Sequence, residues 1–571
     1  MAAILFDQVL DFTGGVNYRA DQFQLKKNET PGILNLEVDP RGGLFTRAGY
    51  QKKHSTAIVT ANTTWLPKSL FNYKAAGAPT IMLSTGYEPV APTNGKVFQS
   101  SGSNFTAINT SAATPLQVKS ENGASFTQWQ DTLYIARGVD GAIPYYYEEG
   151  DTYATALVAS GPTWQPYQAP TGGYMPRAEL NITHANKLFV ANTYEDGTAY
   201  PNRVRWSHEN RPEDWYQQDF IDIMAGGEGI RGLQVIDGQL LIFKSKAVYL
   251  LMGYDADSFQ LVELSTTTGI DYPQQAAAGA GGVFFFDYPQ GLFFYNRNGI
   301  QNLFDRLKPI IETNRINPSL LNYITCSYIN DRLWLSMPFD INDTGSNPSY
   351  VNCNFVFDPT IGQQGAFTLF QSATINNDTD ATIAGWGMVS GCEWRDSNDD
   401  AWHLMISADT AFPFVMYVDD YSEANDDIAA GANFGDFATQ YITSWFYDDR
   451  YVQNKTFVRT LYVVKEVEQN TEIRVNVYHD FNSEDQIASD TLVLNPVSTG
   501  GLYGVGLFGT AVYGTTQLRA GLAVGGRLKT AKAVQLEFVG PTAALTAQPG
   551  RVWGINSIAF KYKRRNIRSN K

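Results

Sequence analysis

The chain has 571 residues, which is too long for one ordinary compact core and indicates two or three domains or a large repeat architecture. Aromatic residues make up 13% and glycine numbers 50, while charged residues are only 17%, a composition typical of many short strands joined by tight turns. The net charge of −15 argues against a basic surface for general nucleic-acid binding, because phosphate neutralisation needs clustered Lys and Arg.

The amino-terminal segment, residues 1–65, reads as an extended arm that ends in a first strand. Its turn signals are the pairs Gly14-Gly15, Pro31-Gly32, Asp39-Pro40 and Gly42-Gly43. Only short alternating runs such as ILNLEV lie between them. The arm therefore has to pack on something larger. Its start, MAAILFDQVLDF, has no basic region before a short apolar run, so we expect no signal peptide.

A loose repeat fills residues 66–436, in which a turn residue precedes four to six apolar residues. Its instances are APTIMLS, DTLYIA, NKLFVA, DGQLLIF, GGVFFF, NDRLWLS and DAWHLMI. Most successive spacings are roughly 45 to 55 residues, the period of a four-stranded propeller blade. A second strand often follows after a polar turn, as NRVRWS follows NKLFVA. The sequence predicts an all-β fold with a β-propeller of six or seven irregular blades, although a pair of sandwiches would give similar spacing.

The end of this region, residues 417–436, is acidic and poorly periodic, which favours a linker or a long surface loop. Asp426, Asp427 and Asp436 could hold calcium, but the alternating ligands of a calcium loop are missing, so we expect a solvated acidic loop. Helix signals are sparse, and FDRLKPIIETNRIN allows one or two helical turns because it contains Pro309.

The carboxy-terminal region, residues 437–571, contains the alternating runs TFVRTLYVVKEV, EIRVNVYHDF, AVQLEFVG and INSIAFKYKRR. Such runs predict a β-sandwich that acts as a platform domain. The three cysteines, Cys326, Cys353 and Cys392, are 27 and 39 residues apart, which fits neither paired disulfides nor zinc ligands. We expect them to be small buried apolar residues, and no stretch of about 18 apolar residues predicts a membrane span.

The stretch NRVRWSHENRPEDWYQQDFIDI, residues 202–223, has the residue types of a hydrolase site, since Glu213 or Asp214 could act as acid or base. It also reads as a shaped loop, because Pro212 fixes φ and Asn210 or Asp214 can bond nearby amides. Its charges can pair locally, so we favour the structural interpretation. No catalytic residue, metal site or cofactor is predicted anywhere in the chain.

Two further groups are candidates for contacts. The segment GVGLFG has the spacing of a dinucleotide loop, but the β-prone TAVYGTT follows it, so we interpret it as a loop in a channel or an interface. Its residues are Gly504, Gly506, Phe508 and Gly509. Basic side chains could contact a neighbouring subunit or an adaptor, and these are Arg203, Arg205, Arg211, Lys563, Arg564, Arg565 and Arg568.

The order of these motifs resembles a known family. The arm GGVNYRADQFQLKKNETPGILNLEVDPRGGLFTRAGY is followed by ANKLFVANTYEDG, NRVRWSHENRPEDW and GEGIRGLQVIDGQLLIFKSKAVYLLMGYDADSF. This order is similar to that of the β-propeller tail proteins of double-stranded DNA bacteriophages, above all the nozzle proteins of short-tailed phages, also called tail tubular protein B. The resemblance covers residues 10–370 in pattern and residues 439–571 more faintly.

The resemblance implies a late structural protein of the virion, made in the host cytoplasm and without enzymatic activity, that forms a homohexameric ring at the distal end of the tail. Its expected partners are other copies of itself, a tail adaptor ring, tail fibres or spikes, and the host envelope at the distal end. Genomic DNA and ejected proteins would pass its lumen without specific binding. An acidic lumen suits that passage, because phosphates meet no lattice of cations.

The alternative is a propeller-type glycan hydrolase or a carbohydrate-binding tail protein that acts on the host envelope. A hydrolase needs a pocket with convergent carboxylates. For a binding module, Trp206, Trp215, Trp334 and Trp402 would be the stacking platforms.

Overall fold

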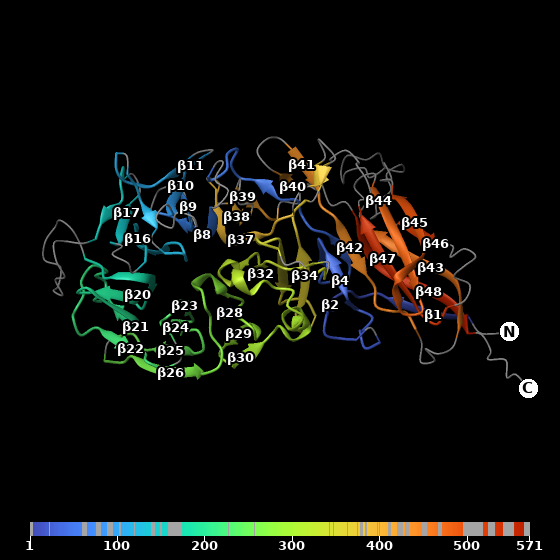
Figure 1. Ribbon diagram of the computed structural model, residues 1–571, viewed down its shortest axis with the longest axis horizontal. Coiled ribbons are helices and arrows are strands. Elements are labelled where there is room, and N and C mark those ends of the chain that lie inside the picture. Colours follow the sequence, from blue (N-terminus) through green and yellow to red (C-terminus); the bar gives the residue numbers. More distant parts are fainter. Residues whose placement is uncertain are drawn as a thin grey trace, which may run out of the picture. The chain divides into compact units, whose positions relative to one another are not determined.

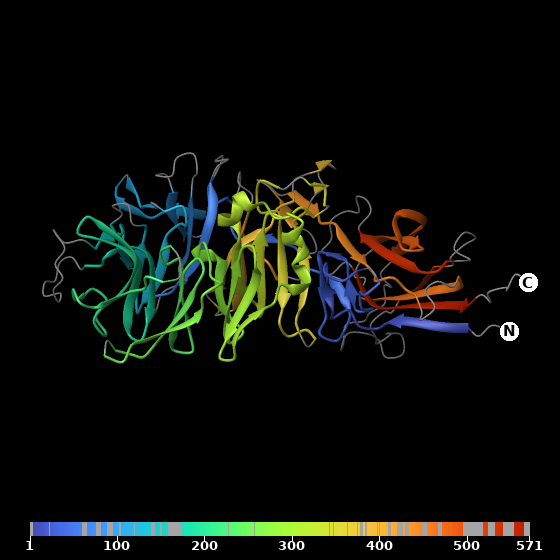
Figure 2. The same cartoon turned by 60° about the horizontal axis from the view of Figure 1, so that its bottom comes forward.

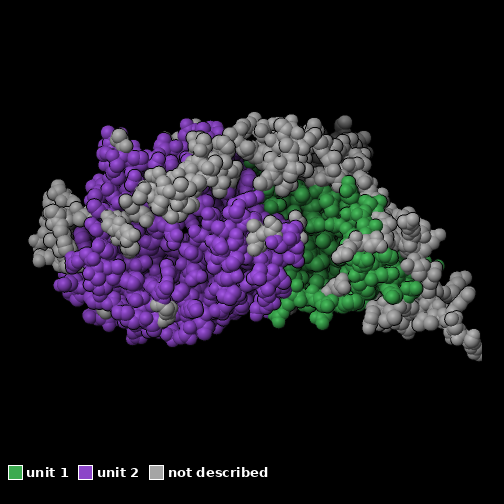
Figure 3. Space-filling view, in the orientation of Figure 1, with its two compact units in different colours: residues 1–51, 354–385, 418–571 green, residues 52–353, 386–417 purple. Residues whose placement is uncertain are grey.

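The computed structural model describes most of the chain (Figure 1). The residues outside the description are 1–3, 22, 60–64, 76–80, 88–94, 102–103, 113, 119, 139–142, 149–150, 158–173, 226–227, 256, 342, 346–347, 363, 374, 377–380, 383–384, 397, 399, 409–412, 420–425, 429–432, 448–453, 466–470, 495–517, 523–530, 541–552 and 565–571. The chain forms two compact units, which Figure 3 colours separately. Unit 1 comprises residues 1–51, 354–385 and 418–571, and unit 2 comprises residues 52–353 and 386–417. The contiguous domain ranges expected from sequence stay a prediction.

Unit 2 is built from antiparallel strands in chain order, most of them in four-stranded sheets. The first two sheets contain β8 (Leu66–Tyr73), β9 (Ile81–Tyr87), β10 (Gly95–Ser101), β11 (Asn104–Ala107) with β14 (Gln117–Val118), and then β15 (Ser125–Trp129), β16 (Thr132–Ala136), β17 (Tyr145–Glu148) and β18 (Thr155–Ala156). The next three contain β19 (Arg177–His184), β20 (Lys187–Glu195), β21 (Thr198–Trp206), β22 (Phe220–Asp222), then β23 (Gly232–Ile236), β24 (Gln239–Phe243), β25 (Val248–Met252), β26 (Gln260–Ser265), then β27 (Ala276–Gly279), β28 (Gly282–Asp287), β29 (Gly291–Asn296) and β30 (Gly299–Asn302). The remaining strands are β12 (Asn109–Ser111), β13 (Thr114–Pro115), β31 (Thr325–Ile329), β32 (Arg332–Met337), β37 (Met388–Arg395), β38 (Ala401–Ser407) and β39 (Val415–Tyr417), while β7 (Gln51–Lys52) lies at the unit boundary.

The first strands of these blades form a ring around a common centre (Figure 1). In the described part of unit 2 they are β8, β15, β19, β23, β27, β31 and β37, and β37 contacts both β31 and β8. Ser390 on β37 accepts a hydrogen bond of 2.8 Å from the Leu70 amide on β8. Lys53, which precedes β8, donates its amide to the Val415 carbonyl on β39, so the segment before the first blade fastens onto the last one. These contacts confirm a β-propeller.

Two-residue turns explain the sequence repeat. Between the first two strands of four blades the turn residues both have positive φ, and they are Ala185-Asn186, Asp237-Gly238, Ala280-Gly281 and Asn330-Asp331. Turns of this kind, type I′, match the twist of a hairpin and favour Asn, Asp and Gly. The second strand begins directly after the turn, so the apolar runs found in the sequence are the second strands. The inner first strands were missed, because they carry polar residues such as Glu179 and Ser327.

Unit 1 contains two large sheets that join both ends of the chain. One has the order β46 (Leu518–Leu522), β43 (Lys455–Lys465), β48 (Gly554–Arg564), β6 (Leu44–Thr46), β5 (Leu36–Val38), with β1 (Ile4–Val9) also on β48. The other has the order β4 (Gly32–Leu34), β42 (Thr439–Ile442), β47 (Val534–Gly540), β44 (Thr471–His479), β45 (Asn482–Leu494). Figure 2 shows the blue first strand beside the red last one, a pairing that runs from Ile4 opposite Lys563 to Val9 opposite Ile558.

The predicted sandwich strands are all present in unit 1, and the arm supplies strands to both sheets. Buried side chains alternate along β44 at Ile473, Val475 and Val477. The ring of Phe560 on β48 lies 3.9 Å from that of Phe446, which is bridged to β47. Smaller strands complete the unit: β2 (Gly15–Val16), β3 (Glu29–Thr30), β33 (Cys353–Asp358), β34 (Ala366–Phe370), β35 (Ile375–Asn376), β36 (Ala381–Thr382), β40 (Asp426–Ile428) and β41 (Asn433–Asp436).

The expectation of a solvated loop at 417–436 is wrong for Asp426. This residue lies in β40, is fully buried, and accepts hydrogen bonds of 2.9 and 2.6 Å from the Arg47 guanidinium. It also accepts from the amides of Tyr50 and Ala373. The sequence could not reveal this, because the partners of Asp426 lie in distant parts of the chain.

Helices are few and short, as expected. The described ones are η2 (Pro273–Gln275), η3 (Asp305–Leu307), α1 (Pro309–Glu312) and η4 (Pro318–Tyr323). Among the residues that the structure describes, no helix has the length and apolar character needed to cross a membrane.

Candidate functional site

The arginines of the stretch 202–223 are occupied inside their own blade. Arg205 donates to both oxygens of Glu195 at 2.7 and 2.8 Å. Arg203 reaches Glu195 at 3.0 Å and makes two bonds of 2.8 Å to Asp222. Burial alone raises the pKa of Glu195, but the bonds from Arg205 and Thr193 outweigh it and lower that pKa below its usual value. The carboxylate is therefore held ionised between two cations.

The acidic residues of the same stretch are also held within the blade region. Glu213 accepts a hydrogen bond of 3.1 Å from the Tyr134 hydroxyl, and its pKa is raised by burial. Asp214 is buried and accepts from the exposed Arg211 at 3.3 Å. Backbone hydrogen bonds close the loop between His208 and Asp214, and one of them runs from the His208 amide to the Asp214 carbonyl at 2.8 Å. The geometry matches the interpretation as a shaped loop.

Three of the four tryptophans considered as sugar platforms lie in the core. Trp206 is 6% exposed, and Trp215 and Trp334 are each 1% exposed. Trp402 is partly buried, packs edge-on against Tyr417 and donates to Asp396. A stacking platform needs an open aromatic face, so the three buried rings cannot serve as one in this conformation.

The remaining predicted contact residues are placed only in part. Lys563 is exposed on β48, and the backbone of Arg564 pairs with Lys455 of β43. Arg565 and Arg568 lie outside the described residues, as does the glycine-rich loop with Gly504, Gly506, Phe508 and Gly509. Contact of the basic residues with another subunit or an adaptor stays a prediction.

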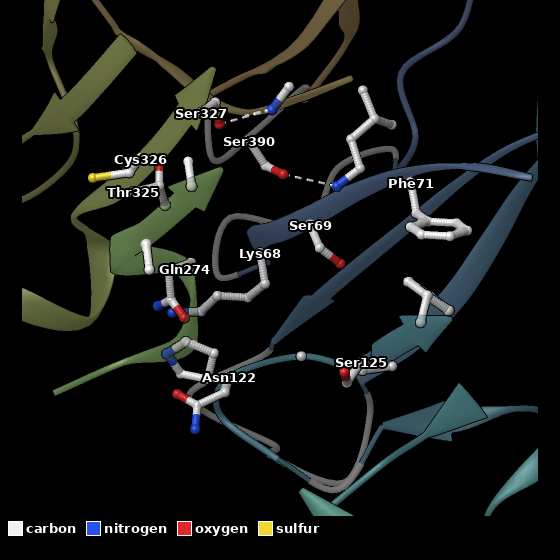
Figure 4. Close-up of a pocket in the computed structure, with 18 of the residues that line it drawn as sticks. Lys68, Ser69, Phe71, Asn122, Ser125, Gln274, Thr325, Cys326, Ser327 and Ser390 are labelled. Atoms are coloured by element: carbon white, nitrogen blue, oxygen red, sulfur yellow. Dashed lines mark hydrogen bonds between the residues drawn. The ribbon is translucent and has the colours of Figure 1, made fainter. Parts of the chain in front are cut away.

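The inner strands of unit 2 line an axial cavity of about 360 Å³ that is partly open to solvent (Figure 4). Its wall comes from β8, β15, β19, β27, β31 and β37, from η2, and from the residues just before β15. The wall combines apolar residues such as Phe71 and Phe126, whose rings lie 5.7 Å apart, with hydroxyl and amide side chains. Polar residues thus converge from strands far apart in the sequence.

Two charged residues of the cavity wall are engaged with protein partners. Burial lowers the pKa of Lys68 to about 8, and its ammonium donates to the Asn322 carbonyl at 2.7 Å. Burial raises the pKa of Glu179, which accepts hydrogen bonds from Ser120 and Asn122. The thiol of Cys326 is buried, which raises its pKa far above the range of a nucleophilic cysteine.

Comparison with known proteins gives no family. No family model matches the sequence, and no curated protein matches it. Solved structures with some similarity include a puromycin-hydrolysing peptidase of Mycobacterium tuberculosis, with TM-score 0.31, 11% identity and coverage of 70% of this chain and 61% of the peptidase. The sialidase of Trypanosoma rangeli gives TM-score 0.26 and 10% identity over 99% of this chain and 97% of that one. The six-bladed fucose lectin of Aleuria aurantia gives a TM-score of 0.26 and 11% identity, with coverage of 55% of this chain and 96% of the lectin.

Scores this low carry no conclusion about the function of the chain, which spans 61% of the peptidase's length. Any statement about the function of the chain therefore has to rest on the geometry of the chain itself. Within the described residues, no cluster of three or more His, Cys, Asp or Glu side chains could hold a metal ion. Cys326 and Cys353 are buried free thiols, as expected, and Cys392 is partly buried.

The sequence did not predict the residues that line the cavity. Lys68, Asn122 and Glu179 lie in segments without a clean apolar alternation, and no motif connects them. A usable signal was nevertheless present. Three of the four type I′ turns follow strands that line the cavity, namely β19, β27 and β31.

Proposed function

We propose that the chain is a structural subunit of a ring-shaped tail nozzle in a short-tailed bacteriophage. In this role the propeller is a rigid building block of the ring, and DNA passes along the ring's lumen without specific binding. The ordered motifs of the arm and the blades support the assignment, as does the acidic net charge of −15.

One observation favours a structural role for the chain over a role as a hydrolase. The cluster with the best residue types for chemistry, in residues 202–223, is held by contacts within the protein. Its arginines form ion pairs with Glu195, Asp222 and Asp214, and Glu213 accepts a hydrogen bond from Tyr134. Arg203 and Arg205 both donate to Glu195, and this network lies across the paired strands β20, β21 and β22 of one blade. A glycosidase instead presents two carboxyl groups to a substrate, about 5 to 10 Å apart across an open pocket.

Electron microscopy of purified full-length protein, and of tails that contain it, tests the proposal. Class averages calculated without imposed symmetry are expected to show a closed ring with a continuous pore, and six copies are expected from the family resemblance. A protein that remains monomeric at high concentration and in isolated tails, or that forms a trimeric spike with clefts, would contradict the proposal.

A variant separates the structural role of the loop from a catalytic one. Glu213→Gln keeps the size of the side chain and an acceptor for the Tyr134 hydroxyl, so ring assembly and infectivity are expected to persist. Loss of a hydrolytic activity on host envelope glycans, in a variant that still folds and assembles, would instead support the enzyme alternative.

A further inference from the structure

The loop between β25 and β26, residues 253–259, presents an aromatic ring to solvent; we call it the Tyr254 loop. Tyr254 is 73% exposed, more than any other large hydrophobic side chain that the structure describes. Its side chain makes no hydrogen bond or ring contact within the described part of the chain. Two exposed aspartates, Asp255 and Asp257, follow it in the loop. The loop therefore offers an aromatic ring and two negative charges to a partner.

Hydrogen bonds within the Tyr254 loop fix its conformation. The amides of Tyr254 and Asp255 each donate to Ser258 Oγ at 3.1 Å, and the Ser258 amide donates to the Asp255 carboxylate at 2.8 Å. At the end of the loop, the ring of Phe259 packs edge-on against Trp206 at 5.0 Å. A tyrosine on an ordered loop loses little conformational entropy on binding, and tyrosine is enriched among the residues that dominate protein interfaces. These are the properties of a protein contact.

Unit 1 carries an aromatic surface that is only partly covered; it consists of Phe23, Tyr447 and Phe481, and we call it the Phe23 patch. The ring of Phe481 lies 4.3 Å from that of Phe23 and 5.7 Å from that of Tyr447, and Phe23 is 44% exposed. Phe481 lies in the turn between β44 and β45 with a φ of 64°, a conformation that favours glycine and that bulky residues rarely adopt. The chain thus accepts an unfavourable backbone to keep a ring in this patch.

Cations border the Phe23 patch. Lys532 is exposed, and its amide donates to Asp480, the residue before Phe481. Lys26 is 71% exposed and is paired with Glu29 only at 3.8 Å. Because the chain has a net charge of −15, two copies repel each other except where cations of one meet carboxylates of the other. The two aspartates of the Tyr254 loop are such carboxylates.

The loop and the patch match in aromatic character and in charge. We propose that the Tyr254 loop of one copy docks on the Phe23 patch of a second copy, with Asp257 of the first beside Lys532 of the second. Each copy has one loop and one patch, so the contact is head-to-tail and repeats until a ring closes. This inference rests on the proposed role as a ring subunit and names the contact between neighbouring subunits.

Variants of the full-length protein that remove one side of the contact test the inference. Tyr254→Ser removes the ring of the loop, while Phe23→Ser combined with Lys532→Glu removes a ring and reverses a charge in the patch. Each is expected to raise the concentration at which half of the chains form rings by about 10-fold or more, as for a residue that dominates an interface. Sedimentation velocity over a concentration series measures the change.

A mixture of the two variants shows whether the contact is head-to-tail. The patch variant keeps an intact loop and the loop variant keeps an intact patch, so one chain of each kind can join once and no further. At a concentration at which each variant alone is monomeric, the equimolar mixture is expected to sediment as a 1:1 dimer. A mixture that stays monomeric would overturn the inference.

Tyr153→Ser is the matched control, because Tyr153 is another exposed tyrosine, at 37%, and lies outside both surfaces. Its ring formation should equal that of the parent. Thermal unfolding midpoints show whether the variants are folded. Should Phe23→Ser lower the midpoint, the exposed charges provide a second test: Asp257→Lys and Lys532→Glu each weaken assembly by about 3- to 10-fold, and their combination restores most of it.

The results separate this inference from the nozzle proposal. Rings that form equally well with Tyr254→Ser and Asp257→Lys would overturn the contact alone, and so would a double charge reversal that assembles no better than either single one. A control variant that weakens assembly as much as Tyr254→Ser would also overturn it. A parent that forms only dimers or open chains through this contact supports the contact and contradicts the nozzle, and a parent that stays monomeric overturns both.

Discussion

At the scale of single residues, several charges are buried, and each depends on its partner. Glu195 is the centre of one such group, because both Arg203 and Arg205 donate to it and little solvent reaches the three side chains. The aromatic rings of Tyr200 and Phe220 each lie 3.9 Å from the Arg203 guanidinium carbon, which adds cation–π attraction. Removal of the shared carboxylate charge therefore affects two cations at once.

Glu195→Gln is expected to destabilise unit 2 by on the order of 3 kcal/mol, because it leaves the buried Arg205 guanidinium without its counter-charge and Arg203 with Asp222 alone. The measurement is the shift of the thermal unfolding midpoint. Glu228→Gln is the control, since Glu228 is 83% exposed in its pair with Arg231, and such surface pairs contribute less than about 1 kcal/mol. An equal shift of the unfolding midpoint for both variants would contradict the statement that the buried pairs of Glu195 matter more for stability than the surface pair of Glu228.

Asp287 predicts a dependence of stability on pH. Burial raises its pKa to about 7, although the Gly269 amide donates to it at 3.1 Å. A carboxyl group with a raised pKa binds its proton more tightly in the folded state, so the folded state loses stability as pH rises from about 4 to about 7. Asp287→Asn is expected to be more stable than the parent at pH 8, with little difference at pH 4.

Thermal unfolding of both proteins across this pH range checks the prediction. The control is Asp237→Asn, which alters a solvent-exposed carboxylate paired with Arg297 at the surface. That variant should keep the pH profile of the parent. A profile that is the same for Asp287→Asn and the parent would show that Asp287 does not titrate as described.

At the scale of elements, each blade depends on a tight hairpin and on dense aromatic packing. Gly238 has a φ of 71° in its type I′ turn, and an added Cβ there would meet open space. Gly282 begins β28, and an added Cβ would lie 2.3 Å from the ring of Phe294. The first glycine is needed for its backbone conformation, the second for close packing.

Alanine substitution at the two glycines separates these effects. Gly238→Ala is expected to cost about 1 kcal/mol, from the left-handed backbone alone. Gly282→Ala is expected to cost more, on the order of 2 to 3 kcal/mol, because β28 or Phe294 has to move. Thermal unfolding midpoints check the ranking, and a greater loss for Gly238→Ala would contradict it.

At the scale of the whole molecule, the two ends of the chain fold together in unit 1. Arg47 in the arm and Asp426 are 379 residues apart in sequence and form a fully buried pair at 2.6 Å. Arg47 also lies 3.8 Å from the ring centres of Tyr50 and Phe437. The arm is thus part of the core of this unit and needs the later chain to fold.

Asp426→Asn is expected to destabilise unit 1 by about 3 to 5 kcal/mol, because Arg47 is left as a buried charge without a counter-ion. The double variant Arg47→Met with Asp426→Asn should recover part of this loss, since it removes the stranded charge as well. Limited proteolysis within residues 1–51, together with thermal unfolding, measures the effect. A double variant that is no more stable than Asp426→Asn alone would contradict this account.

Much of the fold was predictable because its signals are local. The pairs Asp237-Gly238 and Ala280-Gly281, each followed by an apolar run, revealed the propeller through turn chemistry and hydrophobic burial. The sandwich strands were predictable for the same reason. The sequence did not predict the inner strands, because their polar side chains obscure the alternation of apolar and polar residues. It also did not predict the burial of Asp426, because Arg47 and Tyr50, which bind it, lie far away in the arm.

The sequence by itself determined the β class, the blade period and the tight turns, because strand alternation and turn preferences act over a few neighbouring residues. Only the tertiary structure decided which charges are satisfied. Arg205 could pair with Asp214 or Glu213 as readily as with Glu195 when only the sequence is considered, and β20 beside β21 selects Glu195. It also brought Ser69, Asn122, Gln274 and Thr325 around one axis, because closing a ring of blades joins residues that no short-range pattern connects.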